Sequence, residues 1–140
     1  MQHLAILSKK LDLLNKILMK EKTIESRWYK FKKPPFNAIK ENELVYFKES
    51  GMPVTAKAIV EKILFFENLN KDKIKEILLE YGKQIGVDIS YFEEIKDKKF
   101  CILTFLKEPE KIIPFEINKT GYGNMSAWIT MNNIEEIKRR

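Results

Sequence analysis

The sequence predicts an α+β fold built on a small, mixed, mostly antiparallel β-barrel with flanking helices. Short apolar or alternating stretches rich in Val, Ile and Phe recur along the chain, and such stretches are typical of strands. Two regions between them have apolar residues at helical spacing, one after the first stretch and one near the middle. Six or seven short strands, one early helix and a later helical pair describe a single domain over residues 1–140.

The first half of the chain predicts three strands and one helix, besides a charged stretch described below. Residues 3–7 are short and apolar, which suits a buried first strand. Ser8 then has the place of an N-cap for a helix of about three turns. Residues 44–48 and 54–66 predict two strands joined by a turn with Gly and Pro. The second is long enough to bend, and bending helps a sheet to close into a barrel.

The middle of the chain predicts a helical pair inserted between strands. Asn70 is placed to cap the first helix, and Leu69 and Ile74 are spaced as a hydrophobic staple across its start. Gly86 can end that helix. Ser90 has a Glu three residues later, which is capping-box spacing and predicts a short second helix.

The last third of the chain predicts three further strands. Residues 100–106 are almost continuously apolar, as in a strand that is buried on both faces. Residues 111–117 predict another strand, in which Pro114 belongs at a sheet edge or a bulge. Residues 121–123, Gly-Tyr-Gly, predict a flexible loop that can approach a ligand closely. Residues 128–131 predict the final strand.

Residues 22–27, Lys-Thr-Ile-Glu-Ser-Arg, place three charged side chains in a predicted strand. Because successive strand side chains point to opposite faces, Thr23, Glu25 and Arg27 are expected to share one face. Glu25 and Arg27 are then close enough to pair, with Lys22 at the start of the strand. Two interpretations stay open: a surface strand whose charges are solvated and paired, or a lined pocket for an anion or nucleotide.

The order of these segments resembles that of the ASCH domain family. The similarity runs from residues 3–7 through a helix to the Lys-Thr-Ile-Glu-Ser-Arg stretch, then to Pro35, and ends at residues 127–128, Ala-Trp. Members of this family have the PUA-like fold, so the resemblance implies a PUA-like barrel here. It also implies RNA or nucleotide binding in a cleft beside the motif strand. The site residues that the resemblance implies are Lys22, Glu25 and Arg27, with Trp128 nearby.

Composition indicates a folded, basic protein, with 44% hydrophobic residues and a formal net charge of +6. No stretch approaches the roughly 20 apolar residues of a membrane span, and the N-terminus lacks a signal-peptide core. We therefore expect no membrane association. The single cysteine, Cys101, lies in an apolar run, which predicts a buried thiol and a cytoplasmic protein. Because His3 is the one histidine, neither a metal site nor another cofactor is expected.

The positive charge is concentrated in residues 20–40, which hold seven cations against two anions, a local balance of +5. Such a concentration favours a polyanionic partner, although a lysine run is also typical of a solvated loop. Aromatic residues alternate with these lysines, and single-stranded nucleic acid uses this combination because bases stack on rings while ammonium groups hold phosphates. The side chains expected to bind are Tyr29, Phe31, Lys32 and Lys33, whereas Trp28 and Phe36 are expected in the core.

Three functions stay open. The first is a non-catalytic module that binds RNA or a nucleotide, in which Lys22 and Arg27 meet phosphate or base edges and Glu25 orients them. The second is implied by small ASCH proteins that deacylate N-acetylated cytidine: an amidohydrolase in which Glu25, with Lys22, acts as a base on a bound water. The third is an interaction domain whose basic loop docks on an acidic protein. The sequence does not predict the oligomeric state.

Overall fold

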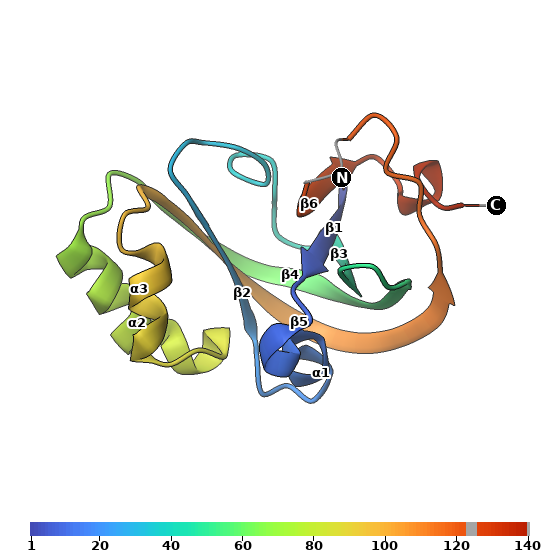
Figure 1. The fold of residues 1–140 in the computed structure, drawn as a ribbon. Coiled ribbons are helices and arrows are strands. Elements are labelled where there is room, and N and C mark those ends of the chain that lie inside the picture. The colour runs from blue at the N-terminus through green and yellow to red at the C-terminus, as the bar shows by residue number, and fades with distance from the viewer. Residues whose placement is uncertain (123–125, 140) are drawn as a thin grey trace.

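The computed structural model describes residues 1–122 and 126–139, which form an α+β fold around one curled, mixed sheet (Figure 1). The six strands lie in the order β2-β5-β4-β3-β1-β6. Their bounds are Gln2–Leu7 (β1), Ile24–Tyr29 (β2), Leu44–Glu49 (β3), Val54–Phe66 (β4), Phe100–Phe115 (β5) and Trp128–Met131 (β6). The helices are Leu13–Leu18 (α1), Lys71–Ile85 (α2) and Phe92–Ile95 (α3), with 3-10 turns at Lys10–Asp12 (η1), Ile89–Tyr91 (η2) and Ile134–Glu136 (η3).

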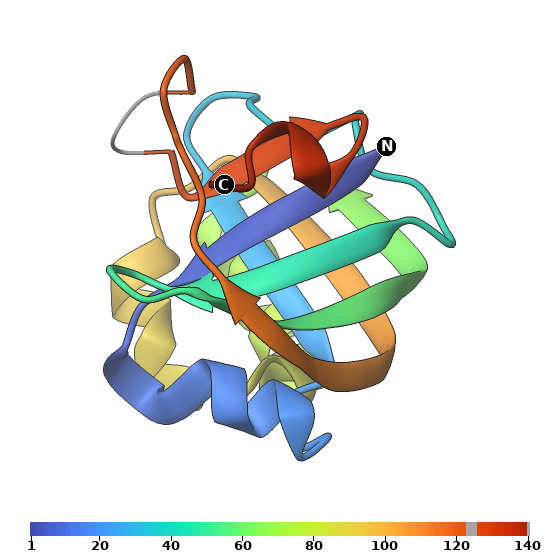
Figure 2. The same cartoon turned by 90° about the vertical axis from the view of Figure 1, so that its right-hand side faces the viewer.

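Two long antiparallel strands, β4 and β5, carry the curl of the sheet. β5 pairs with β4 over most of its length, and its first six residues also pair with β2 on the other side. The register between β4 and β5 shifts at three places, all within residues 54–62 of β4. Because an extra residue bends a strand and increases its twist, these shifts let the sheet wrap around itself (Figure 2). The predicted bending of residues 54–66 is therefore confirmed.

The sheet forms an open half-barrel, which corrects the closed barrel that the sequence predicts. β2 lies at one edge and β6 at the other, and no backbone pairing joins these two strands within the described residues. β1 pairs with β3 in parallel, while the other strand pairs are antiparallel. The prediction of a mixed, mostly antiparallel sheet is confirmed. With only four residues, β6 offers few backbone groups that could extend the sheet toward β2.

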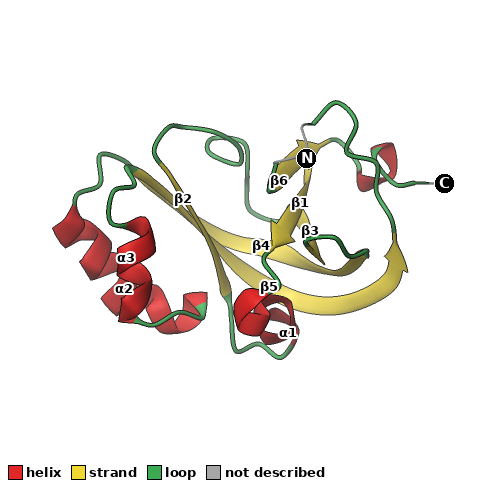
Figure 3. Cartoon of the chain, viewed as in Figure 1, coloured by secondary structure: helices red, strands yellow, loops and turns green. Residues whose placement is uncertain are grey.

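The helical insert between β4 and β5 packs against one face of the sheet at its β2 end (Figure 3). Apolar side chains of α2 form a core there with Ile24 and Trp28 of β2 and with Cys101 and Leu103 of β5. Ile102, which points the other way, belongs to the core on the opposite face, where α1 packs. The prediction that the thiol of Cys101 is buried is confirmed.

The ends of α2 agree with the sequence, whereas the predicted start of the second helix does not. The side chain of Asn70 accepts a hydrogen bond from the backbone N–H of Lys73, and Gly86 ends α2 with a φ of 90°. At the next turn the cap is Asp88, whose side chain accepts from the N–H of Ser90. The predicted cap at Ser90 is wrong because Asp88 has the extended backbone of a cap, while Ser90 lies inside η2 and its hydroxyl donates to Asp88.

The first helix is shorter than predicted. Ser8 accepts a hydrogen bond from the N–H of Lys10, but only the 3-10 turn η1 follows. Leu11 and Asp12 have positive φ values of 66° and 53°, which interrupt a helix, and α1 begins after them. Farther along, the two strands predicted on either side of residue 108 form one strand, β5. None of the helices in the described parts of the chain is long and apolar enough to cross a membrane.

Candidate ligand-binding cavity

A cavity of about 360 Å³ lies beside β2, on the side where the half-barrel is open. β2 supplies five consecutive lining residues, from Glu25 to Tyr29. The end of β1 and the turn after it supply Ile6 to Ser8 and Leu11, and the helical insert supplies Tyr91, Glu94 and Lys98. The charged lining side chains are Lys22, Glu25, Arg27, Glu94 and Lys98, three cations and two anions.

Lys22 precedes β2, and its side chain is buried. Its Nζ donates to the carbonyl oxygens of Ile24, at 2.7 Å, and Ile85, at 2.6 Å, and it lies 3.2 Å from Oε1 of Glu25. These three acceptors match the three donors of an ammonium group. Because the Ile85 carbonyl is at the C-terminal end of α2, the helix dipole also favours a cation there. Lys22 therefore joins β2 to α2, and its donors are occupied by protein atoms.

Glu25 connects Lys22 to Arg27. Its Oε1 faces Lys22, and its Oε2 accepts a hydrogen bond of 2.8 Å from Nη2 of Arg27. The Glu25 side chain is 5% exposed and that of Arg27 is 14% exposed. The interpretation of this stretch as a solvated surface strand is therefore wrong. A carboxylate oxygen has two lone pairs, so Glu25 keeps acceptor capacity toward the cavity.

Burial and charge act in opposite directions on this triad. Burial lowers the pKa of Lys22, while the neighbouring Glu25 carboxylate acts to raise it. Burial alone would raise the pKa of Glu25, but Lys22 and Arg27 together outweigh it and hold that pKa below its ordinary value. Glu25 is therefore ionised at neutral pH. The three acceptors around Nζ of Lys22 favour its protonated form.

Arg27 lies at the open seam of the half-barrel, the gap between the edge strands β2 and β6. Its Nη2 donates to the carbonyl oxygen of Ile6 in β1 at 3.3 Å. Its Cζ lies 5.3 Å from the ring centroid of Trp128, the first residue of β6. The Nε atom of Arg27 is buried and has no hydrogen-bond partner among the described residues. Side-chain contacts of Arg27 thus bridge edges that no strand pairing joins.

The fold has counterparts among solved structures, although no family model and no curated protein sequence matches the chain. ASCH from Zymomonas mobilis gives a TM-score of 0.70 at 13% identity, covering 96% of this chain and 90% of that chain. A point variant of that protein gives 0.72 at 12% identity, covering 96% and 93%. The chain has an ASCH-like fold. The N-terminal domain of Staphylothermus marinus McrB gives 0.50 at 11% identity, covering 82% and 76%.

The ASCH-like fold confirms the resemblance at the level of architecture, and it brings only some of the predicted site residues together. Glu25, Arg27 and Tyr29 line the cavity, as does Lys22. Thr23 precedes β2 and lines a separate cavity of about 220 Å³, so it does not join Glu25 and Arg27 in the lining of the first cavity. The backbone N–H of Thr23 donates to the carbonyl oxygen of Gln84 near the end of α2, and the carbonyl oxygen of Thr23 accepts from the N–H of Leu106 in β5.

The aromatic and basic loop after β2 is folded back on its own residues. Lys33 lies over the Tyr29 ring, 4.7 Å from Nζ to the centroid, and the Tyr29 hydroxyl donates to the Pro34 carbonyl oxygen at 3.1 Å. Lys32 lies 2.9 Å from a carboxylate oxygen of Glu67. Phe31 is 80% exposed. Trp28 and Phe36 are buried as predicted, and Trp128 is buried behind Arg27 without lining the cavity. In the predicted Gly-Tyr-Gly loop, Gly123 lies outside the described residues.

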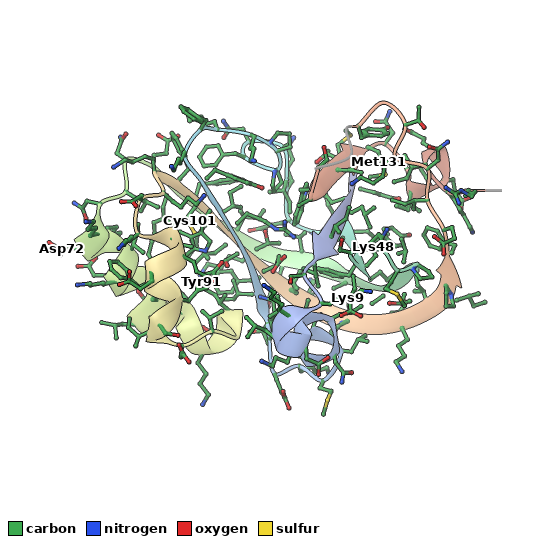
Figure 4. All side chains as sticks on the ribbon, in the orientation of Figure 1. Lys9, Lys48, Asp72, Tyr91, Cys101 and Met131 are labelled. Carbon is green, nitrogen blue, oxygen red and sulfur yellow. The ribbon has the colours of Figure 1, made fainter. Side chains whose placement is uncertain are left out.

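Tyr91 is a lining residue that sequence reasoning missed. It lies in the helical insert, half-buried between α3 and β2 (Figure 4). Burial raises its pKa to about 12, and the carboxylates of Glu25 and Glu94 contribute to this shift. Its hydroxyl is therefore a neutral donor at physiological pH. A lone Tyr in a helical segment carries no sequence signal for this place, because the docking of the insert on β2 creates it.

His3 holds Trp128 of β6 in place through a hydrogen bond, a role that the sequence does not indicate. Its Nδ1 accepts a hydrogen bond of 3.2 Å from Nε1 of Trp128, which can only donate. The ring proton therefore lies on Nε2, which is 2.8 Å from Oε1 of Glu43. Thr130 Oγ1 is 3.0 Å from Nδ1. Burial lowers the pKa of His3, so the imidazole that holds Trp128 in place is neutral at physiological pH.

Proposed function

We propose that this protein is a non-catalytic module that binds single-stranded RNA or a nucleotide, with one base inside the cavity beside β2. One observation carries the proposal: Glu25 and Arg27 place an acceptor and a donor side by side at a nearly buried position in the cavity lining. The edge of each nucleobase offers a matching donor and acceptor. In surroundings of low polarity such hydrogen bonds are strong and discriminating.

Both members of this pair retain hydrogen-bonding capacity. The hydrogen bonds that Arg27 donates within the described chain come from Nη2, and a guanidinium has five N–H donors. Each oxygen of Glu25 meets one cation and can accept another hydrogen bond. A base edge could therefore bind without breaking the triad. The cavity volume also lies at the small end of the range for ligand sites, as a single base requires.

Aromatic rings near the pair support a planar ligand. Tyr29 and Tyr91 line the cavity from β2 and from the helical insert. Bases stack on such rings, and this stacking contributes about 1–3 kcal/mol per base. Lys33 already lies over Tyr29, so a base on that ring would have an ammonium group beside it.

Lysines at one end of the cavity support binding to phosphate. The backbone N–H of Lys99 donates to the carbonyl oxygen of Tyr29, so the segment before β5 lies beside the loop after β2. Lys98 lines the cavity there. The lysines on these two neighbouring segments are Lys30, Lys32, Lys33, Lys98 and Lys99. Exposed Phe31 stands among them as a further ring for stacking.

The hydrolase alternative receives less support from the geometry. A base that activates water must be able to take up a proton. Glu25 lies between two cations that lower its pKa, which makes it a weak base. The ammonium donors of Lys22 are occupied by Ile24, Ile85 and Glu25. The alternative of a protein-interaction domain would use the basic loop but leaves the cavity without a role.

Fluorescence anisotropy with short single-stranded RNA at several salt concentrations tests the proposal. We expect binding that weakens steeply as salt rises, because phosphate contacts release counterions. Heparin serves as a polyanion without bases and should compete poorly with RNA. Failure of RNA, nucleotides and nucleosides alike to bind at low salt would remove the proposal. Turnover of an acylated cytidine by the wild type, lost in Glu25→Gln, would instead establish the hydrolase.

A further inference from the structure

A second cavity, of about 300 Å³, adjoins the first. Leu11, Val87, Tyr91 and Glu94 line both cavities, so these four residues separate them. The second cavity is completed by residues of α1 and of the turn after α2. The second cavity extends away from the basic loop that follows β2. In Figure 1, α1 lies at the lower end of β2, and that loop lies at the upper end.

Lys16 is the cation of this second cavity. It belongs to α1, its side chain is half-buried, and it forms no ion pair within the described chain. Two carboxylates flank the same cavity. That of Asp88 accepts hydrogen bonds from the N–H and the hydroxyl of Ser90, whereas that of Glu94 is exposed at the boundary between the cavities. A lysine that lines a cavity without a carboxylate partner is suited to contact an anionic group of a ligand.

We propose that the second cavity binds a phosphate attached to the nucleoside whose base occupies the first cavity, with Lys16 as its cationic contact. The inference rests on the proposed function and narrows its ligand to a nucleotide, free or within a strand, as opposed to a free nucleoside. At the opposite end of β2, the loop that carries Lys30, Lys32 and Lys33 would contact the bound RNA strand. The nucleotide in the cavity thus has cations on both sides, as an internal nucleotide with two phosphates requires.

Glu94 allows a second test, because removing its negative charge should have the opposite effect on nucleotide binding to removing Lys16. Its carboxylate lines both cavities, so it lies next to the path from base to phosphate. A negative charge there repels phosphate. The variant Glu94→Gln should therefore tighten binding of a nucleotide more than it changes binding of the uncharged nucleoside.

The test compares ribonucleosides with their 5′- and 3′-monophosphates in amide NMR titrations of the whole chain at low salt. We expect at least one monophosphate to bind about tenfold more tightly than its nucleoside, as one charge-assisted contact provides. In Lys16→Gln this difference should fall to within about twofold. Lys83→Gln is the matched control, since Lys83 is exposed on α2 and lines neither cavity. Amide shifts distributed as in the wild type show that each variant is folded.

Each outcome separates this inference from the proposed function. Equal binding of nucleosides and monophosphates would overturn the phosphate site but leave the base site intact. A tenfold difference that persists in Lys16→Gln would overturn the assignment to Lys16. Absence of binding by all three ligand types and by RNA would overturn the proposed function itself. A dinucleotide that binds at least as tightly as the monophosphate, and loses affinity in Lys16→Gln, supports a phosphate within a strand.

Discussion

The guanidinium carbon of Arg27 lies 5.3 Å from the centroid of the Trp128 ring, so side chains from the two edge strands meet across the open seam. A contact of this kind contributes about 0.5–2 kcal/mol. Trp128 is in turn held by His3, near the start of β1, whereas the cavity is lined by Ile6 and Leu7 at the end of that strand. The shape of the cavity therefore depends on residues from β1, β2 and β6 together.

The variant Arg27→Lys should weaken RNA binding about tenfold or more and lower the unfolding free energy by about 1–2 kcal/mol. Lysine keeps the charge but cannot contact Glu25, Ile6 and Trp128 together, because it lacks the planar fork. Anisotropy and urea denaturation measure the two effects. Arg139→Lys, at an exposed position, is the control and should change neither. Unaltered binding in Arg27→Lys would exclude a fork-dependent contact with the ligand.

The variant Lys22→Met should destabilise the protein by about 3–5 kcal/mol. The methionine fills the volume of the lysine stem but leaves the carbonyl oxygens of Ile24 and Ile85 without their donor and Glu25 with one cation fewer. Urea denaturation measures the loss, and Lys20→Met, at an exposed neighbouring position, should cost little. A small loss in Lys22→Met would show that the buried ammonium does not hold β2 to α2.

Glu25 should contribute stability that disappears in acid. Its pKa in the folded protein lies below the ordinary value of 4.5, so the folded state binds the proton less readily than the unfolded chain does. The contribution is complete above the unfolded pKa and is lost as the pH falls through the folded pKa. Glu25→Gln should therefore be less stable than the wild type by about 3 kcal/mol at pH 7, and the gap should narrow below about pH 4.5. A gap that stays constant down to acid unfolding would contradict the ionised triad.

The two lysines of the loop should differ in their effect on RNA binding. Lys33→Ala should weaken binding of every RNA sequence and lower the salt slope by about one unit, as loss of a phosphate contact does. Lys32→Ala should have a smaller effect, because Lys32 already pairs with Glu67. Glu67→Gln should free Lys32 and tighten binding. Salt titrations followed by anisotropy measure all three variants. Salt slopes equal to that of the wild type in all of them would show that the loop is solvated and does not contact RNA.

Many of the local elements could be predicted from the sequence alone, because their signals lie within a few residues of one another. The strand predicted at residues 54–66 has those bounds in the structure, and Asn70 and Gly86 delimit α2 as their chemistry requires. The pairing of Glu25 with Arg27 was also predictable, since they are two positions apart in one strand and therefore on the same face. The ASCH-like fold followed from the order of such elements together with the motif residues.

The role of the charged stretch at residues 22–27 depends instead on contacts between segments that are distant in the sequence. Lys22 is buried because the end of α2, with Ile85, docks on it from 63 positions farther along the chain. Arg27 meets Trp128 because the half-barrel brings its two edges together without strand pairing, and Tyr91 reaches the cavity because the insert packs on β2. No local pattern encodes these contacts. Burial by distant segments turned a stretch that would otherwise be solvated into a charged triad at the edge of a cavity.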